Sequence, residues 1–343
     1  MANGYLCYHH TDMDGKAAGF EVYNYLVNQG VKPNANMFIM RGYDEPYNED
    51  DFANKVVFIV DLSFTLSSIQ KLFTICEGAA EVFWIDHHKS SIECIEDNDI
   101  RFKLDNYKNL TYFVNNYACG ALLSHYFFNH RERKFPSNES IDYKFTWAKA
   151  GALKVDDPHF GTAHIDIPKY LRFVDQWDRW VYGNDPEPVW FNYGCDTHNT
   201  SLFCYATKES QSKTFNNHFW GYVLENYFVN TILHDGKVAK RYSDGRARAA
   251  RVAGAYECNI SGYKALVLNY SGNSQVFGPR IKDYDLVCLW QFNGKSGLYT
   301  YSFYTDKDNV DCAKLATKYN PNGGGHQKAA GFSHPELLFK PKI

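Results

Sequence analysis

Several kinds of sequence feature are missing from this chain, and each absence narrows what the protein can be. The nine cysteines are odd in number and form no CxxC pair, so neither a full disulfide framework nor a thiolate zinc site is expected. No apolar run approaches the ~20 residues that a membrane-spanning helix needs. The N-terminus also lacks a basic region followed by an apolar run. We therefore expect a cytoplasmic protein with reduced cysteines and no membrane partner.

An excess of positive charge is missing as well. The formal net charge is −3, from 36 Lys and Arg against 39 Asp and Glu. Because nothing global attracts the chain to long duplex nucleic acid, an anionic substrate must be bound by a local cluster or a metal. Apolar and aromatic residues are plentiful, at 45% and 17% of the 343 positions, which is ample for folded cores.

Short apolar runs alternate with helical patterns in the N-terminal part of the chain. The predicted strands are 5–8, 37–40, 56–60 and 82–85, and the predicted helices are 17–26, 66–76, 118–128 and 167–177. This alternation predicts βαβ units and a parallel sheet that is covered on both faces. Residues 183–200, rich in Asn, Pro, Asp and Gly, are interpreted as a loop.

The C-terminal part has a different pattern. A helical stretch from about 216 to 255, interrupted by Gly236 and Gly245, predicts a connector. Beyond it lie predicted strands at 265–270, 285–292, 298–304 and 329–332, and a helix at 310–319. We therefore expect an α/β fold with a parallel-sheet catalytic domain at 1–200, a helical connector at 201–255 and a smaller α+β domain at 256–343.

Acidic and histidine side chains follow three of the predicted strands directly. They are His10, Asp12 and Asp14 after the first strand, Asp61 after the third, and Asp86, His87 and His88 after the fourth. A doubly wound parallel sheet brings these strand ends to one edge, where such folds bind ligands. Carboxylates gathered there would repel one another unless a cation compensates them, and mixed oxygen and imidazole donors suit Mn²⁺, Mg²⁺, Fe²⁺ or Co²⁺. Each motif alone could be a turn or a helix cap, but all three at strand ends predict a metal centre.

Two choices among the candidate ligands stay open. His9 is an extra imidazole beside His10, although the His-x-Asp-x-Asp spacing favours His10. The stretch LRFVDQWDRW at 171–180 offers a further carboxylate, either Asp175 or Asp178. The spacing does not separate these two cleanly, and we favour Asp178 slightly.

The stretch NPNGGGHQKAAGF at 320–332 carries a different chemistry. Its three glycines, Gly323, Gly324 and Gly325, let the backbone approach an anion closely. His326 and Lys328 can add charge-assisted hydrogen bonds to phosphate oxygens. A glycine run alone is typical of a flexible turn, but the following His-x-x-Ala-Ala-Gly-Phe makes it more specific.

Four motifs together resemble one enzyme superfamily. HTDMDG at 10–15, VDLS at 60–63, DHH at 86–88 and GGGHQKAAGF at 323–332 are similar to the motifs of the DHH phosphoesterases. Within them, the chain resembles the branch with the DHH-associated C-terminal domain, which includes oligoribonucleases (nanoRNases), cyclic dinucleotide phosphodiesterases and the RecJ exonuclease. The resemblance implies a site for two ions, usually Mn²⁺, with Mg²⁺ or Co²⁺ as substitutes.

The resemblance also implies individual roles. One ion would be held by His10, Asp12 and Asp61, and the other by Asp14, Asp61, His87 and the aspartate of the 171–180 stretch. Asp61 would thus bridge the two ions. His88 would act on the scissile phosphate or its leaving oxygen, with support from Asp86.

The second domain would grip the nucleotide end through the glycine loop, His326 and Lys328. Relatives often carry an arginine in this domain where Tyr304 stands here. Either Arg280 replaces that arginine, or the substrate differs.

The implied function is a metal-dependent phosphodiesterase acting on short oligonucleotides or on small cyclic or linear nucleotides. A RecJ-like single-strand exonuclease would need further nucleic-acid-binding modules and a longer basic track. The motifs are also compatible with a small-nucleotide phosphatase, a manganese pyrophosphatase (which would not be expected to have the GGGH loop) and a nucleotide-sensing module. Decay into a sensor should first erase metal ligands, and every expected ligand type is present. The sequence does not decide whether the substrate is RNA or DNA. A homodimer is possible.

Overall fold

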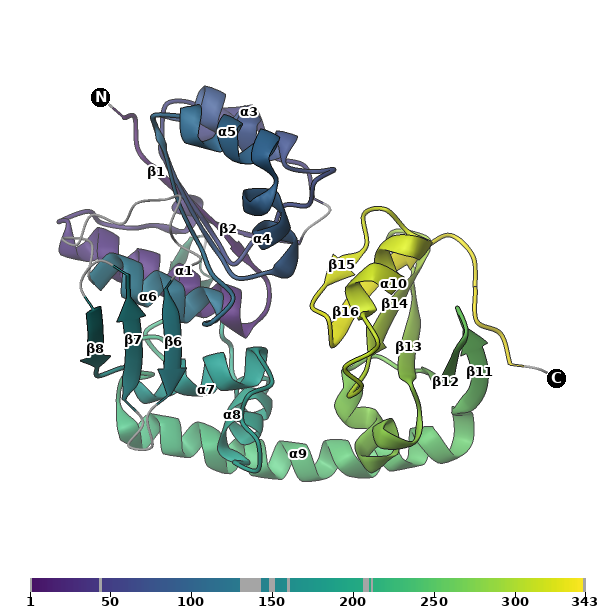
Figure 1. Ribbon diagram of the computed structural model, residues 1–343. Coiled ribbons are helices and arrows are strands. Elements are labelled where there is room, and N and C mark those ends of the chain that lie inside the picture. The colour runs from purple at the N-terminus through teal and green to yellow at the C-terminus, as the bar shows by residue number, and fades with distance from the viewer. Residues whose placement is uncertain are drawn as a thin grey trace. The chain divides into compact units, whose positions relative to one another are not determined.

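The computed structural model describes residues 2–42, 45–129, 143–147, 152–158, 161–205, 210 and 212–341. The chain divides into two compact units, Met1–Ala239 and Lys240–Ile343. Helix α9, Asn226–Gly254, runs across the boundary between them (Figure 1). The three-part division with limits at 200 and 255 stays a prediction.

A five-stranded parallel sheet forms the centre of the first unit, and its strand order is β2-β1-β3-β4-β5. Its strands are β1 (Tyr5–His10), β2 (Phe38–Arg41), β3 (Val56–Val60), β4 (Glu81–Asp86) and β5 (Leu110–Val114). The predicted α/β class with a parallel sheet is therefore confirmed, and four of the five strands were predicted from their apolar runs. The fifth, LTYFV, was not predicted, although its β-branched and aromatic residues favour a strand.

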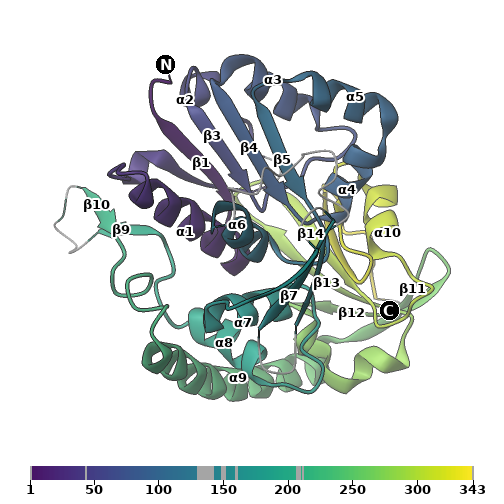
Figure 2. The ribbon, with the colours of Figure 1, turned by 60° about the vertical axis from the view of Figure 1, so that its left-hand side comes forward.

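Helices cover both faces of this sheet, because alternate strand residues point to opposite sides. Phe58 and Phe83 belong to the core beneath α1 and α6, whereas Ile59 and Trp84 belong to the core beneath α3, α4 and α5 (Figure 2). These helices are α1 (Met13–Asn28), α3 (Gln70–Gly78), α4 (Lys89–Glu96), α5 (Asn98–Asn106) and α6 (Gly120–Asn129), with the short α2 (Glu49–Phe52) and the 3₁₀ turn η1 (Ala35–Met37) in the connections.

The rest of the first unit follows α6. It comprises a three-stranded antiparallel sheet, two helices and a hairpin: β6 (Lys144–Trp147), β7 (Leu153–Asp157), β8 (Gly161–Ile165), α7 (Lys169–Asp178), α8 (Glu187–Cys195), β9 (Phe203–Tyr205) and β10 (Lys213–Phe215). The predicted loop at 183–200 is wrong, because α8 lies within it. Pro188 stands in the first turn of α8, where its missing N–H costs no helical hydrogen bond. Phe191 and Cys195 bury the inner face of the helix.

Helix α9 is continuous, so the prediction that Gly236 and Gly245 interrupt it is also wrong. A Cβ atom at Gly236 would lie 1.6 Å from the carbonyl oxygen of Trp190 on α8. This glycine therefore permits close packing of two helices instead of ending one. At Gly245 a Cβ atom would meet nothing within 4 Å.

The second unit contains a six-stranded sheet in the order β11-β12-β13-β14-β16-β15. All neighbouring strands are antiparallel except β12 and β13. The elements are β11 (Tyr256–Ile260), β12 (Tyr263–Asn269), η3 (Ser274–Asp283), β13 (Leu286–Asn293), β14 (Leu298–Tyr304), α10 (Cys312–Tyr319), β15 (Gly324–Gly325) and β16 (Ala329–His334). The predicted α+β character is confirmed. Among the described residues of the whole chain, no helix is both long and apolar enough to cross a membrane.

Candidate metal centre

The opening motif lies where β1 passes into α1. His10 is the last residue of β1, and Asp12 caps α1 by accepting a hydrogen bond from the Gly15 amide at 2.9 Å. The other oxygen of Asp12 lies 2.8 Å from His10 Nδ1. A Cβ atom at Gly15 would lie 2.6 Å from the His10 backbone, so this turn requires glycine. The helix begins earlier than the predicted 17–26, which places Asp14 in its first turn.

Asp14 is held by the N-terminus of α6. Its two oxygens accept hydrogen bonds from the Gly120 and Ala121 amides, both at 2.8 Å. The side chain is buried, and burial together with the nearby Asp12 raises the pKa of Asp14 to about 6. The positive end of the α6 dipole partly compensates this carboxylate.

Asp61 follows β3 with φ at +55°, a conformation that is uncommon for a residue other than glycine. Its amide donates to the carbonyl oxygen of Ile85 at 2.9 Å, which ties the turn to β4. A Cβ atom at Gly120 would lie 2.7 Å from the Asp61 Cβ, so α6 approaches here only because residue 120 is glycine. Asp61 is 1% exposed, and neither of its oxygens accepts a hydrogen bond from the described residues. Burial and the carboxylates of Asp14 and Asp12 raise its pKa well above the usual range.

The DHH motif ends β4 and begins the turn into α4. Asp86 is fully buried and accepts hydrogen bonds from His88 Nδ1, at 2.8 Å, and from the Ser91 hydroxyl. Burial alone would lower the pKa of His88, but the Asp86 carboxylate outweighs it and raises that pKa to about 9. His87 points the other way: its Nε2 lies 3.4 Å from an Asp14 oxygen and 3.3 Å from Asp61 Oδ1.

The two aspartates left open in the 171–180 stretch have different surroundings. Asp175 is fully buried, and its oxygens accept from the Cys119 amide (2.8 Å), Trp147 Nε1 (2.6 Å) and Arg179 Nε and Nη2 (2.8 and 2.7 Å). Asp178, at the end of α7, places Oδ2 3.4 Å from His87 Nε2, and this oxygen accepts no hydrogen bond from the described residues. The structure thus brings Asp178 into the cluster and engages Asp175 elsewhere.

Several groups of three side chains with ligand atoms within 4.8 Å of one another lie at this edge of the sheet, and two of them share no residue. His10, Asp12 and Asp61 form the first, and Asp14, His87 and Asp178 form the second, whereas Asp61, Asp86 and His88 form a group that overlaps the first at Asp61. Asp61 connects the first and second groups, because its Oδ1 is 3.3 Å from His87 Nε2 while its Oδ2 is 4.0 Å from His10 Nδ1. Oxygen and imidazole donors with orphaned, buried carboxylate oxygens fit divalent cations such as Mn²⁺.

One residue near this edge was missed by the sequence analysis. Arg41 ends β2 and pairs in register with His10. Its side chain is buried, with the guanidinium carbon 5.1 Å from the Tyr8 ring centroid and 4.5 Å from that of Tyr47. Its Nε donates to no described residue, and no ion pair joins Arg41 to a described carboxylate. The sequence signal for Arg41 is a polar residue directly after the apolar run FIM, at a strand end that carries no acidic or histidine side chain.

In the second unit, the glycine loop forms a tight turn before β16. A Cβ atom at Gly323 would lie 2.8 Å from the Ala316 carbonyl oxygen, and Gly325 has φ at +138°. A Cβ atom at Gly324 would meet nothing within 4 Å, so this part of the loop is open. The His326 amide donates to the Ala329 carbonyl at 2.7 Å, and the Ala329 amide donates back at 3.3 Å.

Lys328 and Arg280, the two positively charged side chains predicted to bind substrate in this unit, already have partners. Lys328 Nζ lies 2.7 Å from Asp308 Oδ1, in an exposed ion pair. Arg280 donates from Nη2 to the Tyr284 hydroxyl at 2.8 Å, and that hydroxyl donates to Glu257. Among the described contacts, none joins Arg280 to the glycine loop.

Comparisons with known proteins find solved structures that are similar to this chain at low sequence identity. No family model matches the sequence, and no curated protein matches it. Similar solved structures include the DHH domain of a member of the s1p family of ribosomal proteins, at 14% identity and a TM-score of 0.46, covering 96% of this chain and 82% of that one. RecJ from Thermus thermophilus in complex with Mn²⁺ has 14% identity and a TM-score of 0.45, covering 96% of this chain and 49% of RecJ.

A third similar structure is the pGpG-specific phosphodiesterase PggH from Vibrio cholerae. It has 12% identity and a TM-score of 0.35, and the match covers 96% of this chain and 92% of PggH. With identities below 25% and TM-scores below 0.5, these likenesses assign no activity to this chain by themselves. The chain is thus similar in structure to proteins with a DHH domain.

Proposed function

We propose that this protein is a metal-dependent phosphodiesterase of the DHH superfamily that cleaves short oligonucleotides or small cyclic or linear nucleotides. The observation that carries the proposal is the pair of three-residue groups that meet at Asp61. Two adjacent divalent-cation sites are the usual machinery for hydrolysing phosphate esters. The chemistry belongs to phosphoryl transfer, and the motif order along the chain is that of the superfamily.

The residues that would hold the cations are those of the two groups, with Asp178 preferred to Asp175. Bound Mn²⁺ supplies a hydroxide at neutral pH and offsets negative charge on the phosphate. The protein's part is to leave both oxygens of the buried Asp61 and Oδ2 of the half-buried Asp178 without a described hydrogen-bond donor, so that they are available. Asp14 is fixed in place by the amides of α6, so its carboxylate needs little rearrangement.

His88 is the proposed proton donor. Its Nδ1 is engaged by Asp86, which fixes the ring orientation, and Nε2 is the atom that would serve a leaving oxygen. A pKa of about 9 keeps the imidazole protonated at neutral pH. A group that holds its proton until the leaving oxygen develops charge acts as a general acid. Asp86 would support this role without touching the substrate.

Each unit, taken by itself, offers groups that suit a phosphate. Arg41 carries a positive charge that no described carboxylate compensates, beside the His10 end of the sheet. The amides of the glycine loop, with His326, suit a terminal phosphate. Lys328 would have to exchange Asp308 for such a phosphate, whereas Arg280 would have to leave Tyr284.

A metal-dependence assay on a substrate panel tests the proposal. The full chain is treated with EDTA, reloaded with Mn²⁺, Mg²⁺ or Co²⁺, and given dinucleotides, longer single strands, cyclic mono- and dinucleotides, 3′-phosphoadenosine 5′-phosphate and pyrophosphate. We expect Mn²⁺-dependent cleavage of dinucleotides or cyclic dinucleotides, lost in Asp61→Asn and kept in Glu93→Gln, which alters an exposed carboxylate on α4.

The same panel separates the competing functions. Preference for long single strands would indicate an exonuclease, and cleavage of pyrophosphate alone would indicate a pyrophosphatase. Saturable nucleotide binding without turnover, with Mn²⁺ bound, would indicate a sensing module and refute the enzymatic proposal. We also propose a cytoplasmic location, since all nine cysteines are free thiols, as suits a reducing compartment.

A further inference from the structure

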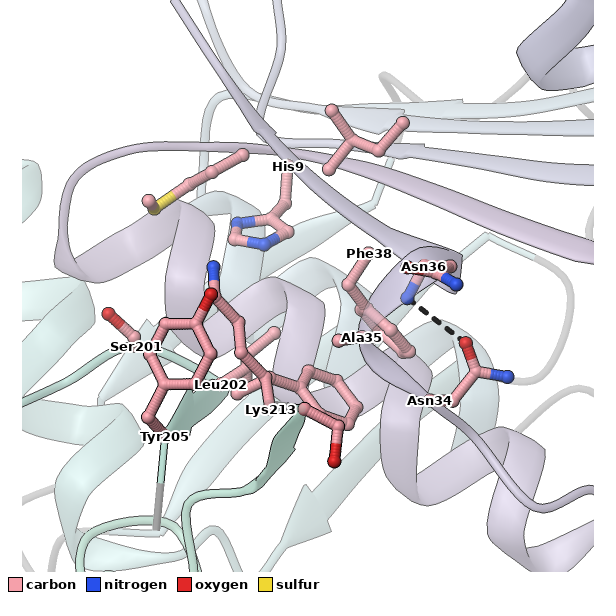
Figure 3. Close-up of a pocket in the computed structure, with 13 residues that line it drawn as sticks. His9, Asn34, Ala35, Asn36, Phe38, Ser201, Leu202, Tyr205 and Lys213 are labelled. Atoms are coloured by element: carbon pink, nitrogen blue, oxygen red, sulfur yellow. Dashed lines mark hydrogen bonds between the residues drawn. The ribbon is translucent and has the colours of Figure 1, made fainter. Parts of the chain in front are cut away.

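A large pocket lies in the first unit, beside the edge strand β2 and the β9–β10 hairpin (Figure 3). Its volume is about 760 Å³, which is in the usual range for sites that bind small organic ligands. Its lining comes from β1, the 3₁₀ turn η1, β2, the segment before β9, and the hairpin itself. The lining side chains that matter below are those of His9, Asn34, Asn36, Phe38, Phe203, Tyr205 and Lys213.

His9, the imidazole that the metal groups do not use, is part of this pocket. Neighbouring strand residues point to opposite faces, so His9 turns away from His10 and its ring points into the pocket (Figure 3). The side chain is 3% exposed, and Nδ1 donates to the His10 carbonyl oxygen at 2.9 Å. A Cβ atom at Gly19 would lie 3.1 Å from the His9 ring, so a bare glycine on α1 makes room for it. This leaves Nε2 as the polar atom that His9 can offer to a ligand.

The segment that forms one wall of the pocket is firmly anchored. Lys16 Nζ donates to the Thr200 hydroxyl at 3.0 Å, and Trp220 Nε1 donates to the Thr200 carbonyl at 3.1 Å. Asn216 Nδ2 donates to the carbonyl oxygen of Ser201 at 3.0 Å. The wall is therefore preorganised by side chains of α1 and of the segment after β10, which lowers the cost of ordering it around a ligand.

The chemistry of the lining specifies a ligand class. Phe38, Phe203 and Tyr205 provide aromatic surface, and Asn34 and Asn36 provide amide donors and acceptors. None of the 13 described lining residues is acidic, and Lys213 contributes one cation. A flat ring with a polar edge and an attached anion satisfies all three features. A nucleotide has that composition, whereas a purely apolar ligand would leave Lys213 with only the Tyr205 ring, whose centroid is 5.6 Å from Nζ, and would offer the Asn36 side-chain amide no partner.

We propose that this pocket binds one nucleoside unit of the substrate, with the base against the aromatic side chains and a phosphate near Lys213. The base edge would meet the Asn36 amide and His9 Nε2. His9 and His10 are consecutive residues of β1, so the pocket adjoins the strand end that carries the metal groups, although their side chains point to opposite faces of the sheet. This inference rests on the proposed function and adds to it: base recognition would occur in the first unit, beside the metal groups.

The first experiment compares two substrates. Bis(p-nitrophenyl) phosphate contains a phosphodiester but no base, whereas the dinucleotide pApA contains both. The ratio of kcat/KM for pApA to that for bis(p-nitrophenyl) phosphate should fall about tenfold in Tyr205→Ala, because a base–aromatic stack contributes on that order. Asn36→Ala and Lys213→Ala should lower the same ratio.

The matched control is Phe102→Ala, which removes a ring that is 70% exposed on α5, outside the pocket. It should leave the ratio unchanged. An unchanged ratio in all three pocket variants, with the fold verified by circular dichroism, would overturn the inference.

The second experiment needs no turnover, so it separates failure of the pocket from failure of the proposed function. The metal-free full chain is photolabelled with 8-azido-AMP, and the labelled peptides are identified by mass spectrometry. We expect saturable labelling at residues 34–40, 201–205 or 212–213, suppressed by AMP but not by inorganic phosphate, and reduced in Tyr205→Ala. Labelling confined to other peptides, or labelling that AMP does not suppress, would refute the pocket even if the protein is a phosphodiesterase.

Discussion

Asp175 and Asp178 lie almost one turn apart on α7, and the structure predicts opposite consequences for neutralising them. Asp175 accepts four hydrogen bonds, two of them from Arg179, and is fully buried. Asp178 has an oxygen beside His87 that accepts none from the described residues. We therefore expect Asp175→Asn to affect folding and Asp178→Asn to affect metal binding.

The magnitude for Asp175→Asn follows from the ion pair it breaks. The Arg179 side chain is only 17% exposed, so its charge would lose its partner in a poorly hydrated position. Removing one member of a buried pair costs about 3–5 kcal/mol, and the amide oxygen of asparagine retains part of the interaction, which suggests the lower end. For a unit of this size, about 3 kcal/mol lowers the Tm by roughly 6–12 °C.

Asp178→Asn should behave differently in the metal-free protein. Burial and the carboxylates of Asp14 and Asp12 raise the pKa of Asp178, so its charge is unfavourable there. Removing that charge should leave the Tm in EDTA unchanged or slightly higher. At Mn²⁺ concentrations of about 100 times Kd the wild type gains roughly 2.7 kcal/mol, and this gain should be lost in the variant.

Thermal unfolding followed by circular dichroism, in EDTA and in Mn²⁺, measures both effects. Glu93→Gln is the control, since its carboxylate is 52% exposed and makes only a surface ion pair, worth about 0–1 kcal/mol. The assignment would be wrong if Asp178→Asn destabilised the metal-free protein as strongly as Asp175→Asn and still responded to Mn²⁺. It would be equally wrong if Asp175→Asn abolished the Mn²⁺ response without lowering the Tm in EDTA.

Three further predictions concern the same site. Because Asp14, with a metal-free pKa of about 6, and Asp61 and Asp178, whose pKa values are also raised, must all be ionised to bind cations, Mn²⁺ affinity measured by calorimetry should fall by more than tenfold per pH unit below 6; a flat profile would contradict this. Gly120→Ala places a Cβ atom 2.7 Å from that of Asp61, so it should lower the free energy of unfolding by about 1–3 kcal/mol and weaken Mn²⁺ binding. Its control, Gly245→Ala, adds a Cβ atom that meets nothing within 4 Å and should raise the free energy of unfolding by about 1 kcal/mol; denaturant titrations measure both changes. His88→Asn should lower kcat about 10²- to 10⁴-fold while the Mn²⁺-induced rise in Tm persists, and loss of both would make His88 a ligand.

The parts of the site that follow strand ends could be predicted from sequence, because a short apolar run determines both the strand and the side of the sheet where its next residue lies. Asp61 directly after VVFIV is the clearest example. The choice between Asp175 and Asp178 could not be made in this way. It depends on the Cys119 amide and Trp147, residues far away in the sequence, which occupy one carboxylate and leave the other.

Two further differences between prediction and structure have a similar physical origin. Helix α8 was taken for a loop because its proline, glycine and asparagine content lowers helix propensity, while its stability comes from burying residues such as Phe191 in the core of the first unit. Arg41 could not be recognised from sequence, because it stands out only by forming no ion pair with a described carboxylate. A missing partner is visible only once all the neighbours are in place.

The charges at this edge of the sheet can be followed one by one, and they explain why a cation is needed. His88 compensates Asp86, Arg179 compensates Asp175, and the N-terminus of α6 partly compensates Asp14. Asp61 and Asp178 receive no such donor from the described residues, although Asp61 is almost completely buried. An uncompensated buried carboxylate is costly and tends to take up a proton instead. Asp12, the last carboxylate at this edge, is half-exposed and lies beside His10. The remaining charge is therefore concentrated where the two three-residue groups meet, and a divalent cation there would satisfy it without disturbing the Asp86–His88 and Asp175–Arg179 pairs.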